Sequence, residues 1–287
     1  MEEKVTFSFG KNWKKYLKNV TNDQIRDATG DIQEWLGNYI ISGKSVLDIG
    51  SGSGIHSYAF HLLGVEKVDS FDYDHYSIEA TRDLWEKSGK PVNWSVFQGS
   101  ILDDNFIENL PDYDIVYSWG VLHHTGDMWK AIQNAGSKVR LGGLFWISIY
   151  AKGPNYSQHL KLKRKYNSSS NFTKTIMVYD RIWRRRIFGN WDISFIPTSF
   201  NEVRVVIDIL YFRIKHYKTE FRWNEKNQRG MDSNYDIIDW LGGLPYEVAS
   251  PDEVITFCNK LGFKLEKIKE AKEGSCCNYL FKKENKI

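Results

Sequence analysis

The chain has 287 residues, 41% of them apolar, and 39 basic against 36 acidic side chains give it a formal net charge of +3. This length allows one large domain, or one domain with a sizeable insertion, and the apolar residues are sufficient for a buried core. The three cysteines, Cys258, Cys276 and Cys277, exclude a disulfide framework, and the adjacent pair lacks the spacing of a zinc site.

Neither a membrane span nor a secretory signal is visible. No stretch approaches the roughly 18 consecutive apolar residues that cross a bilayer, and the first residues, MEEKVTFSFGKNW, lack the apolar run of a signal peptide. We therefore expect a cytoplasmic protein with no transmembrane segment.

Strand-like apolar runs alternate with amphipathic helical segments over residues 44–151. The strand-like runs are SVLDIG, KVDSFDY, VNWSVFQG, YDIVYSWG and GLFWISIY. Such alternation predicts βαβ units, and therefore an α/β fold with a doubly wound, mostly parallel sheet. Residues 1–43 precede this core, and we expect them to form a helical leader.

Residues 152–249 differ in character and predict a helical insertion after the fifth strand. The segment FTKTIMVYDRIWRRRIF places apolar residues at helical spacing, and FNEVRVVIDILYFRIKHY repeats the pattern with more apolar residues. An insertion of this size could cover a substrate pocket or form a dimer interface.

The chain then returns to the core over residues 250–287. Ser250 is the expected N-cap of a helix, with Pro251 at its first position and Glu253 completing a capping box, and Gly262 is expected to end it. Two further strands, FKLEKIKE and CNYLFKK, follow.

Three glycines, Gly50, Gly52 and Gly54, lie between the first strand and the following helix. Turns of this kind need unusual dihedral angles and close approach of the backbone to a ligand, although purely structural turns also use glycine. A dinucleotide fingerprint would have its third glycine where this chain has Ile55. Two carboxylates are nearby: Asp48 at the end of the first strand, and Asp72 at the end of the second, where it could accept both hydroxyls of a ribose.

Taken in order, the motifs VLDIGSGSG, SFDYD, FQGSILDD and DIVYSWGVLHH resemble those of the class I, Rossmann-like S-adenosylmethionine-dependent methyltransferases. The likeness extends to FSFGKNW, GVLHHTGDMWKAI, RGMDSNYDIIDWLGG and LPYEVASPDE, which are similar to a bacterial group associated with surface-glycan and secondary-metabolite pathways. The resemblance implies a seven-stranded sheet of order 3-2-1-4-5-7-6, in which CNYLFKK supplies the antiparallel strand.

The resemblance also implies a cofactor, S-adenosylmethionine, with S-adenosylhomocysteine as its product. Asp72 would hold the ribose hydroxyls, Tyr73 would lie against the adenine, and the loop after the third strand would flank the adenine ring. Many relatives have an acid where this chain has Ser100, which leaves open whether Ser100 or a backbone amide contacts the adenine amino group. The residues expected to border the cofactor are Asp48, Gly50, Ser51, Gly52, Gly54, Asp72, Tyr73, Ser100, Ile101, Ser118 and Trp119.

Methyl transfer is an in-line displacement, and a base is needed only if the acceptor must lose a proton. His123 and His124 follow the fourth strand, where such a base would lie, and we favour His124. The alternative is that one or both histidines pack beneath the sheet or orient loops. Trp119 could contact the sulfonium or form a wall of the pocket.

Two further segments could bind the acceptor. In the leader, Phe9, Asn12, Trp13 and Tyr16 could close the pocket or belong to an ordinary amphipathic helix. Where the insertion returns to the core, polar residues could bind acceptor hydroxyls or serve as caps and salt-bridged loop residues. They are Arg229, Asp232, Asp236, Tyr246 and Glu247.

We therefore expect methyl transfer to an oxygen or nitrogen of a small-molecule or sugar-containing acceptor, with no metal. Two alternatives remain open. The basic residues in KLKRKY and RIWRRRIF could bind RNA, as in a tRNA-modifying methyltransferase, although they could also form a solvated helix face or meet a phosphorylated or lipid-linked glycan. The protein could also be a scaffold that binds without turnover. A homodimer through the insertion is possible.

Overall fold

The computed structural model describes residues 8–10, 22–37, 39–188, 207, 211 and 233–285, without the side chains of 183–188 and 233–235. The chain forms two compact units. The first comprises residues 1–161, 228–230 and 243–287, and the second comprises residues 162–227 and 231–242. The boundaries expected from the sequence for the leader (1–43), the core (44–151 and 250–287) and the insertion (152–249) stay predictions.

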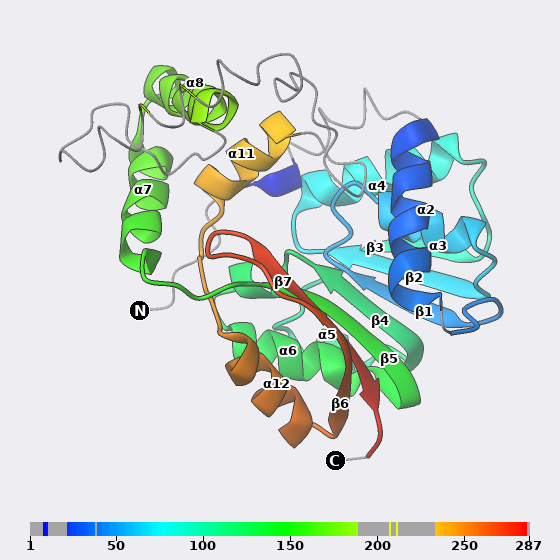
Figure 1. Ribbon diagram of the computed structural model, residues 1–287. Helices are drawn as coiled ribbons and strands as arrows, with labels where there is room; N and C mark the ends of the chain where they lie inside the picture. Colours follow the sequence, from blue (N-terminus) through cyan, green and yellow to red (C-terminus); the bar gives the residue numbers. More distant parts are fainter. Residues whose placement is uncertain are drawn as a thin grey trace. The chain divides into compact units, whose positions relative to one another are not determined.

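The first unit contains a seven-stranded sheet of order β3-β2-β1-β4-β5-β7-β6 (Figure 1). Its first five strands are parallel, and β7 is antiparallel to both β5 and β6. This arrangement confirms the expected fold class and strand order. The strands are β1 (Ser45–Ile49), β2 (Lys67–Asp72), β3 (Trp94–Gln98), β4 (Tyr113–Trp119), β5 (Val139–Tyr150), β6 (Phe263–Lys269) and β7 (Cys276–Lys283).

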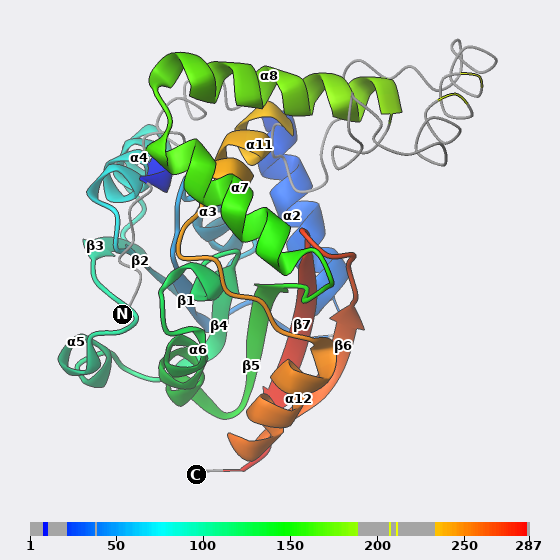
Figure 2. The ribbon, with the colours of Figure 1, turned by 90° about the vertical axis from the view of Figure 1, so that its left-hand side faces the viewer.

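Helices cover both faces of the sheet (Figures 1 and 2). One layer consists of α2 (Asn22–Leu36), α3 (Ile55–Leu62) and α4 (His75–Lys87), and the other of α5 (Asp104–Glu108), α6 (Met128–Ser137) and α12 (Pro251–Lys260). Alternate residues of β5 face the two layers: Phe145 and Ile147 join the core under α6 and α12, whereas Trp146 stacks on Trp35 of α2. Burial of these apolar side chains on both faces stabilises the sheet.

The helix that starts the C-terminal part of the chain has the predicted capping box. The Ser250 hydroxyl accepts from the Glu253 N–H, and the Glu253 carboxylate accepts from the Ser250 N–H at 2.8 Å. Gly262 follows the helix with a φ of +77°, a conformation that favours glycine.

The second unit is helical in the part that the structure describes. It holds the end of α7 (Tyr156–Ser168), together with α8 (Asn171–Phe188) and α11 (Ser233–Gly242). Lys163 is fully buried: its Nζ donates to the Trp240 carbonyl and lies 4.6 Å from the centre of the Trp240 ring. The segment 200–217, expected to form a second apolar helix, lies outside the described residues apart from 207 and 211. Among the described helices, none is long and apolar enough to cross a membrane.

Candidate active site

The glycine loop lies between β1 and α3, at the carboxyl ends of the parallel strands. The N–H groups of Gly50 and Ser51 both donate to the carbonyl of Phe71 on β2, at 2.8 and 3.1 Å. Gly50, Gly52 and Gly54 have φ values of +76°, +54° and +76°. All three lie in the left-handed region, where residues with a Cβ are strained, so the loop needs glycine at these positions.

Close packing adds a second reason for glycine at both ends of this loop. A Cβ on Gly50 would lie 2.4 Å from a methyl carbon of Val121, and one on Gly54 would lie 2.9 Å from a methyl carbon of Thr81. Thr81 also donates from its hydroxyl to the Gly52 carbonyl at 3.2 Å. Packing against the loop after β4 and against α4 therefore also requires glycine at positions 50 and 54. The sequence alone indicates a bound ligand as the reason for these glycines.

Asp72, at the end of β2, faces the glycine loop. One of its carboxylate oxygens accepts from the Gly52 N–H at 3.1 Å, and the other accepts from the Asp74 N–H at 2.8 Å. Burial raises the pKa of Asp72 to about 6, although these two N–H groups act to lower it. An acceptor-rich group thus lies directly beside Gly52, which has no side chain.

Asp48 is more deeply placed than Asp72, with only 2% of its surface exposed. It accepts from the Ser57 hydroxyl. Ser57 in turn accepts from Ser70, and Ser70 from the indole N–H of Trp94, each at 2.8 Å. Burial raises the pKa of Asp48 to about 7, and the charge of Asp72 adds to this shift. Asp48 therefore anchors a buried polar chain that connects β1, α3, β2 and β3 beneath the loop.

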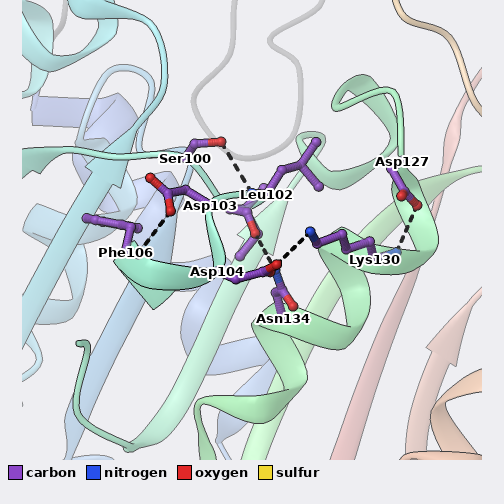
Figure 3. Close-up of polar contacts among 9 residues, drawn as sticks. Ser100, Leu102, Asp103, Asp104, Phe106, Asp127, Lys130 and Asn134 are labelled. Atoms are coloured by element: carbon purple, nitrogen blue, oxygen red, sulfur yellow. Dashed lines mark hydrogen bonds and ion pairs between the residues drawn. The ribbon is translucent and has the colours of Figure 1, made fainter. Parts of the chain in front are cut away.

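The loop after β3 is held by contacts of its own (Figure 3). The Ser100 hydroxyl accepts from the Leu102 N–H at 3.2 Å, and Ile101 is buried. Asn134 of α6 donates to the Ile101 carbonyl at 2.8 Å. The Ser100 side chain is thus directed back onto its own loop, and its contact with adenine stays a prediction. Tyr73, at the end of β2, is 64% exposed and could lie against a planar ring.

A second set of contacts fastens α5 to α6 below this loop. The Asp104 carboxylate accepts from Lys130 at 2.9 Å and from Asn134 at 3.1 Å, and Figure 3 shows it between these two side chains. The lysine lowers the pKa of Asp104. These groups are exposed to solvent, so we interpret them as support for the loop and not as chemistry.

Two residues at the end of β4 have contacts across the sheet. The Ser118 hydroxyl donates to the Ile49 carbonyl at 3.0 Å and is fully buried. The Trp119 indole N–H donates to the Asn278 side-chain oxygen at 3.1 Å, which directs the indole toward β7. This geometry favours the interpretation of Trp119 as a wall of the site.

The histidine pair follows β4 in a short 3-10 helix, η2 (Leu122–His124), and both side chains are buried. His124 Nδ1 lies 2.6 Å from the Pro245 carbonyl oxygen. Because a carbonyl oxygen only accepts, Nδ1 carries the proton, and in the neutral ring Nε2 has the lone pair. Phe9 lies 5.1 Å from the His124 ring between centroids, and the His123 ring packs 4.2 Å from Tyr150. His124 therefore has the defined tautomer that a base requires, whereas the geometry of His123 favours packing.

The segment that leads from α11 to α12 reaches this histidine loop. The Glu247 carboxylate accepts from the N–H groups of Gly126 and Met128, both at 3.1 Å. Tyr246 is 2% exposed and packs against Tyr150 and Tyr156. For both residues this geometry favours the structural alternative over direct binding of an acceptor. Five other residues proposed for binding lie outside the described residues: Asn12, Trp13, Tyr16, Arg229 and Asp232.

Sequence reasoning missed the attachment of residues 8–10 to Asp74. The Ser8 hydroxyl and the Gly10 N–H both donate to the Asp74 carboxylate, at 2.7 and 3.0 Å. Asp74 is also the N-cap of α4, where it accepts from the Tyr76 N–H. An aspartate just before a helical segment predicts an N-cap from the sequence. Its contact with residues 8–10 has no such signal. Among the described residues, no group of three or more His, Cys, Asp or Glu side chains could hold a metal ion.

Comparison with known proteins agrees with this arrangement. Residues 22–191 match the family model described as a methyltransferase domain. The chain belongs to this methyltransferase family. Its fold is similar to that of magnesium protoporphyrin IX methyltransferase from Synechocystis, solved with bound SAH, with a TM-score of 0.54 and 11% identity over 96% of this chain and 95% of that one. A SAM-dependent methyltransferase from Aquifex aeolicus gives a TM-score of 0.50 and 13% identity over 97% and 100%.

Curated relatives match over a shorter span. Ribosomal protein L11 methyltransferase of Photobacterium profundum is 30% identical over 129 residues, which is 45% of this chain and 43% of that protein. The Staphylococcus saprophyticus protein of the same name is 29% identical over 125 residues, or 43% and 38%. The chain thus spans less than half the length of these relatives. The family model confirms the expected class, a methyltransferase, and the two solved structures share the fold of this chain.

Proposed function

We propose that this protein transfers the methyl group of S-adenosylmethionine to an oxygen or nitrogen of a small-molecule or sugar-containing acceptor. The observation that carries the proposal is the hydrogen bond between Gly52 and Asp72, which joins a turn with glycine at alternate positions to a carboxylate at the end of the next strand. Such a carboxylate suits a ribose diol, and the start of α3 suits the carboxylate of a bound amino acid. The cofactor would supply an electrophilic methyl group on a positively charged sulfur.

The residues around the loop would divide the binding between them. Asp72 would accept from both ribose hydroxyls, and the exposed ring of Tyr73 would cover the adenine, with Ser100 and Ile101 on its other side. The glycine loop with Ser51, and Asp48 beneath it, would border the methionine part, while Ser118 and Trp119 would close the site at the end of β4. The buried walls would also exclude water from the reacting atoms.

His124 is the residue that we assign to proton transfer. Its Nδ1–H is held by the Pro245 carbonyl, so Nε2 is the atom that would accept a proton from an acceptor hydroxyl or amine. His123 would support it by packing. The rest of the catalytic effect comes from alignment, because a displacement at methyl requires the attacking atom, the methyl carbon and the sulfur to be in line.

The acceptor class is proposed from the likeness of sequence segments. The likeness to the glycan and secondary-metabolite group includes RGMDSNYDIIDWLGG and LPYEVASPDE, and the insertion supplies residues that could recognise an acceptor, among them Arg229 and Asp232. The names of the curated relatives refer to ribosomal protein L11, but the similarity covers less than half of either chain. In α7 the basic side chains of Lys161, Arg164 and Lys165 are exposed, which fits a solvated helix face as well as contact with RNA phosphates.

Calorimetry with S-adenosylmethionine and S-adenosylhomocysteine tests the cofactor assignment, and we expect saturable binding of one molecule per chain. A methyl-labelled donor then tests acceptors in parallel: phosphorylated sugars, nucleotide-linked sugars, ribosomal protein L11 and tRNA. Label in a sugar would support the proposed acceptor. Label in L11 or tRNA would replace it with a macromolecular acceptor, and binding without transfer to any acceptor would favour a scaffold. Sedimentation of the same sample tests the proposed homodimer.

A further inference from the structure

We propose that Glu247 is a positioning residue, which fixes the histidine loop so that His124 presents Nε2 to the acceptor. The inference rests on the proposed role of His124 and assigns Glu247 a role other than contact with the acceptor.

Four hydrogen bonds attach the segment 244–247 to the loop that contains the histidines and to the start of α6. The Pro245 carbonyl accepts from His124 Nδ1 at 2.6 Å, and the Glu247 N–H donates to the His123 carbonyl at 3.0 Å. The Glu247 carboxylate accepts from Gly126 and Met128 at 3.1 Å. The Pro245 carbonyl, which selects the His124 tautomer, is therefore two residues before Glu247. The side chain and the backbone N–H of Glu247 both hold the same loop.

Capping of α6 explains only one of the two hydrogen bonds of the Glu247 carboxylate, because Met128 begins the helix and Gly126 lies before it. Asp127 already serves as the N-cap of α6, and its side chain accepts from the Lys130 N–H at 3.1 Å. Glu247 adds a second carboxylate at the same helix start, from a segment 119 residues away from Met128 along the chain. Burial raises the pKa of Glu247, and the two N–H groups partly offset that cost. A half-buried carboxylate that also accepts from Gly126, before the helix, is explained if it fastens the segment 244–247 to the histidine loop.

The two elements that these contacts join are otherwise separate in sequence. Leu244–Glu247 connect α11 to α12, whereas His124 follows β4. The backbone of Pro245 can orient the His124 ring only while the two segments stay in register. Without the Glu247 carboxylate, we expect Pro245 to move relative to His124, so that its carbonyl no longer selects the proton position on the ring.

The experiment compares Glu247→Ala and Glu247→Gln with a matched control, Glu253→Ala. Glu253 is also a helix N-terminal carboxylate that accepts a backbone N–H, but it belongs to the capping box of α12. Imidazole ¹⁵N spectra report the tautomer of each histidine, and a His124→Gln spectrum assigns the signal of His124 among the seven histidines. Thermal unfolding and S-adenosylhomocysteine affinity are measured on the same samples.

In the wild type we expect the His124 signal to show the Nδ1-protonated tautomer. Glu247→Ala should give a mixture of tautomers, with unchanged affinity for S-adenosylhomocysteine. Glu247→Gln should give a tautomer mixture between those of the wild type and Glu247→Ala. Its amide oxygen can accept one N–H, but its NH₂ group faces the other. Glu253→Ala should lower the unfolding temperature and leave the His124 signal unchanged. A wild-type His124 signal in both Glu247 variants would overturn the inference.

The readout does not depend on turnover, so the two proposals can fail separately. If no acceptor is methylated but the tautomer responds to Glu247, the positioning role holds and the proposed function fails. If methyl transfer is found but His124 keeps its tautomer in Glu247→Ala and Glu247→Gln, the positioning role fails alone.

Discussion

The side chain of Val121 occupies the space in which a Cβ on Gly50 would lie, at a distance of 2.4 Å. Gly50 follows β1 and Val121 follows β4, so the two residues bring together the two strand ends between which the site is built. The first glycine of the loop is therefore required by a backbone angle and by a neighbouring side chain together.

Gly50→Ala should destabilise the protein more than Gly120→Ala does. The two glycines have φ values of +76° and +72°, so each alanine would carry about 1–2 kcal/mol of left-handed strain. Only Gly50 has heavy atoms near the new Cβ, whereas Gly120 has none within 4 Å. We expect an additional loss of about 1–3 kcal/mol for Gly50→Ala from overpacking, measured by denaturant unfolding.

Val121→Ala provides the second half of that test. If the contact with Val121 is the cause, Gly50→Ala should lose less stability in the Val121→Ala background than in the wild type. Equal losses in both backgrounds, or equal effects of the alanines at 50 and 120, would leave the backbone angle as the only cause.

Replacing Asp72 by alanine should weaken the binding of S-adenosylmethionine by about 1–3 kcal/mol, the typical effect of losing a charged hydrogen-bond acceptor. Asp72→Asn should lose less, because it keeps one acceptor oxygen. Asp83→Asn, an exposed position on α4, serves as the control. Calorimetry measures all three, and unchanged affinity in Asp72→Ala would rule out the proposed contact with the ribose.

Cofactor affinity should rise with pH between about 5 and 8. Burial raises the pKa of Asp72 to about 6 and that of Asp48 to about 7, so both carboxyls hold protons in the free protein below these values. Ribose hydroxyls and a cationic ligand favour the ionised carboxylates, so binding must release protons in this window and becomes stronger as they are lost.

Calorimetry in two buffers of different ionisation enthalpy measures that release directly. We expect proton release at pH 6 and almost none at pH 8.5. In Asp72→Asn, the part of the pH dependence near 6 should disappear, and the part due to Asp48 should move to lower pH, because the charge of Asp72 no longer raises the pKa of Asp48. Affinity that does not change between pH 5 and 8 would contradict the placement of these two carboxyls at the cofactor.

Asp74→Ala should release the segment 8–10 as well as the start of α4. The carboxylate accepts from Ser8, Gly10 and Tyr76, so its loss removes an N-cap and the attachment of a segment distant in sequence. Asp103→Ala is the matched control, since Asp103 caps α5 through the Phe106 N–H. Each variant should lose about 1 kcal/mol of stability.

Hydrogen exchange at the Gly10 amide separates the two variants. The exchange should become faster in Asp74→Ala and stay as in the wild type in Asp103→Ala, because only Asp74 accepts from Gly10. The same exchange rate in both would show that the contact at 3.0 Å does not hold the segment in solution.

The sequence by itself determined the features that depend on neighbouring residues. Alternating apolar runs gave the strands of the sheet, and the capping box of Ser250 and Glu253 gave the start of α12. The place of Asp72 beside the glycine loop also follows from the sequence. Both come at the carboxyl ends of parallel strands, and these ends meet at one edge of a sheet. These features have local signals, either a period of two or of 3.6 residues or a fixed offset from a helix start.

Only the tertiary structure decided which distant groups meet. Pro245 selects the tautomer of His124 from 121 residues away, and Glu247 contacts the start of α6, although its sequence position also allowed a role in substrate binding. The crowding of Gly50 by Val121 likewise has no signal in either segment. Contacts of this kind depend on strand register and on how loops pack after the sheet has formed, and no periodicity of the chain records them.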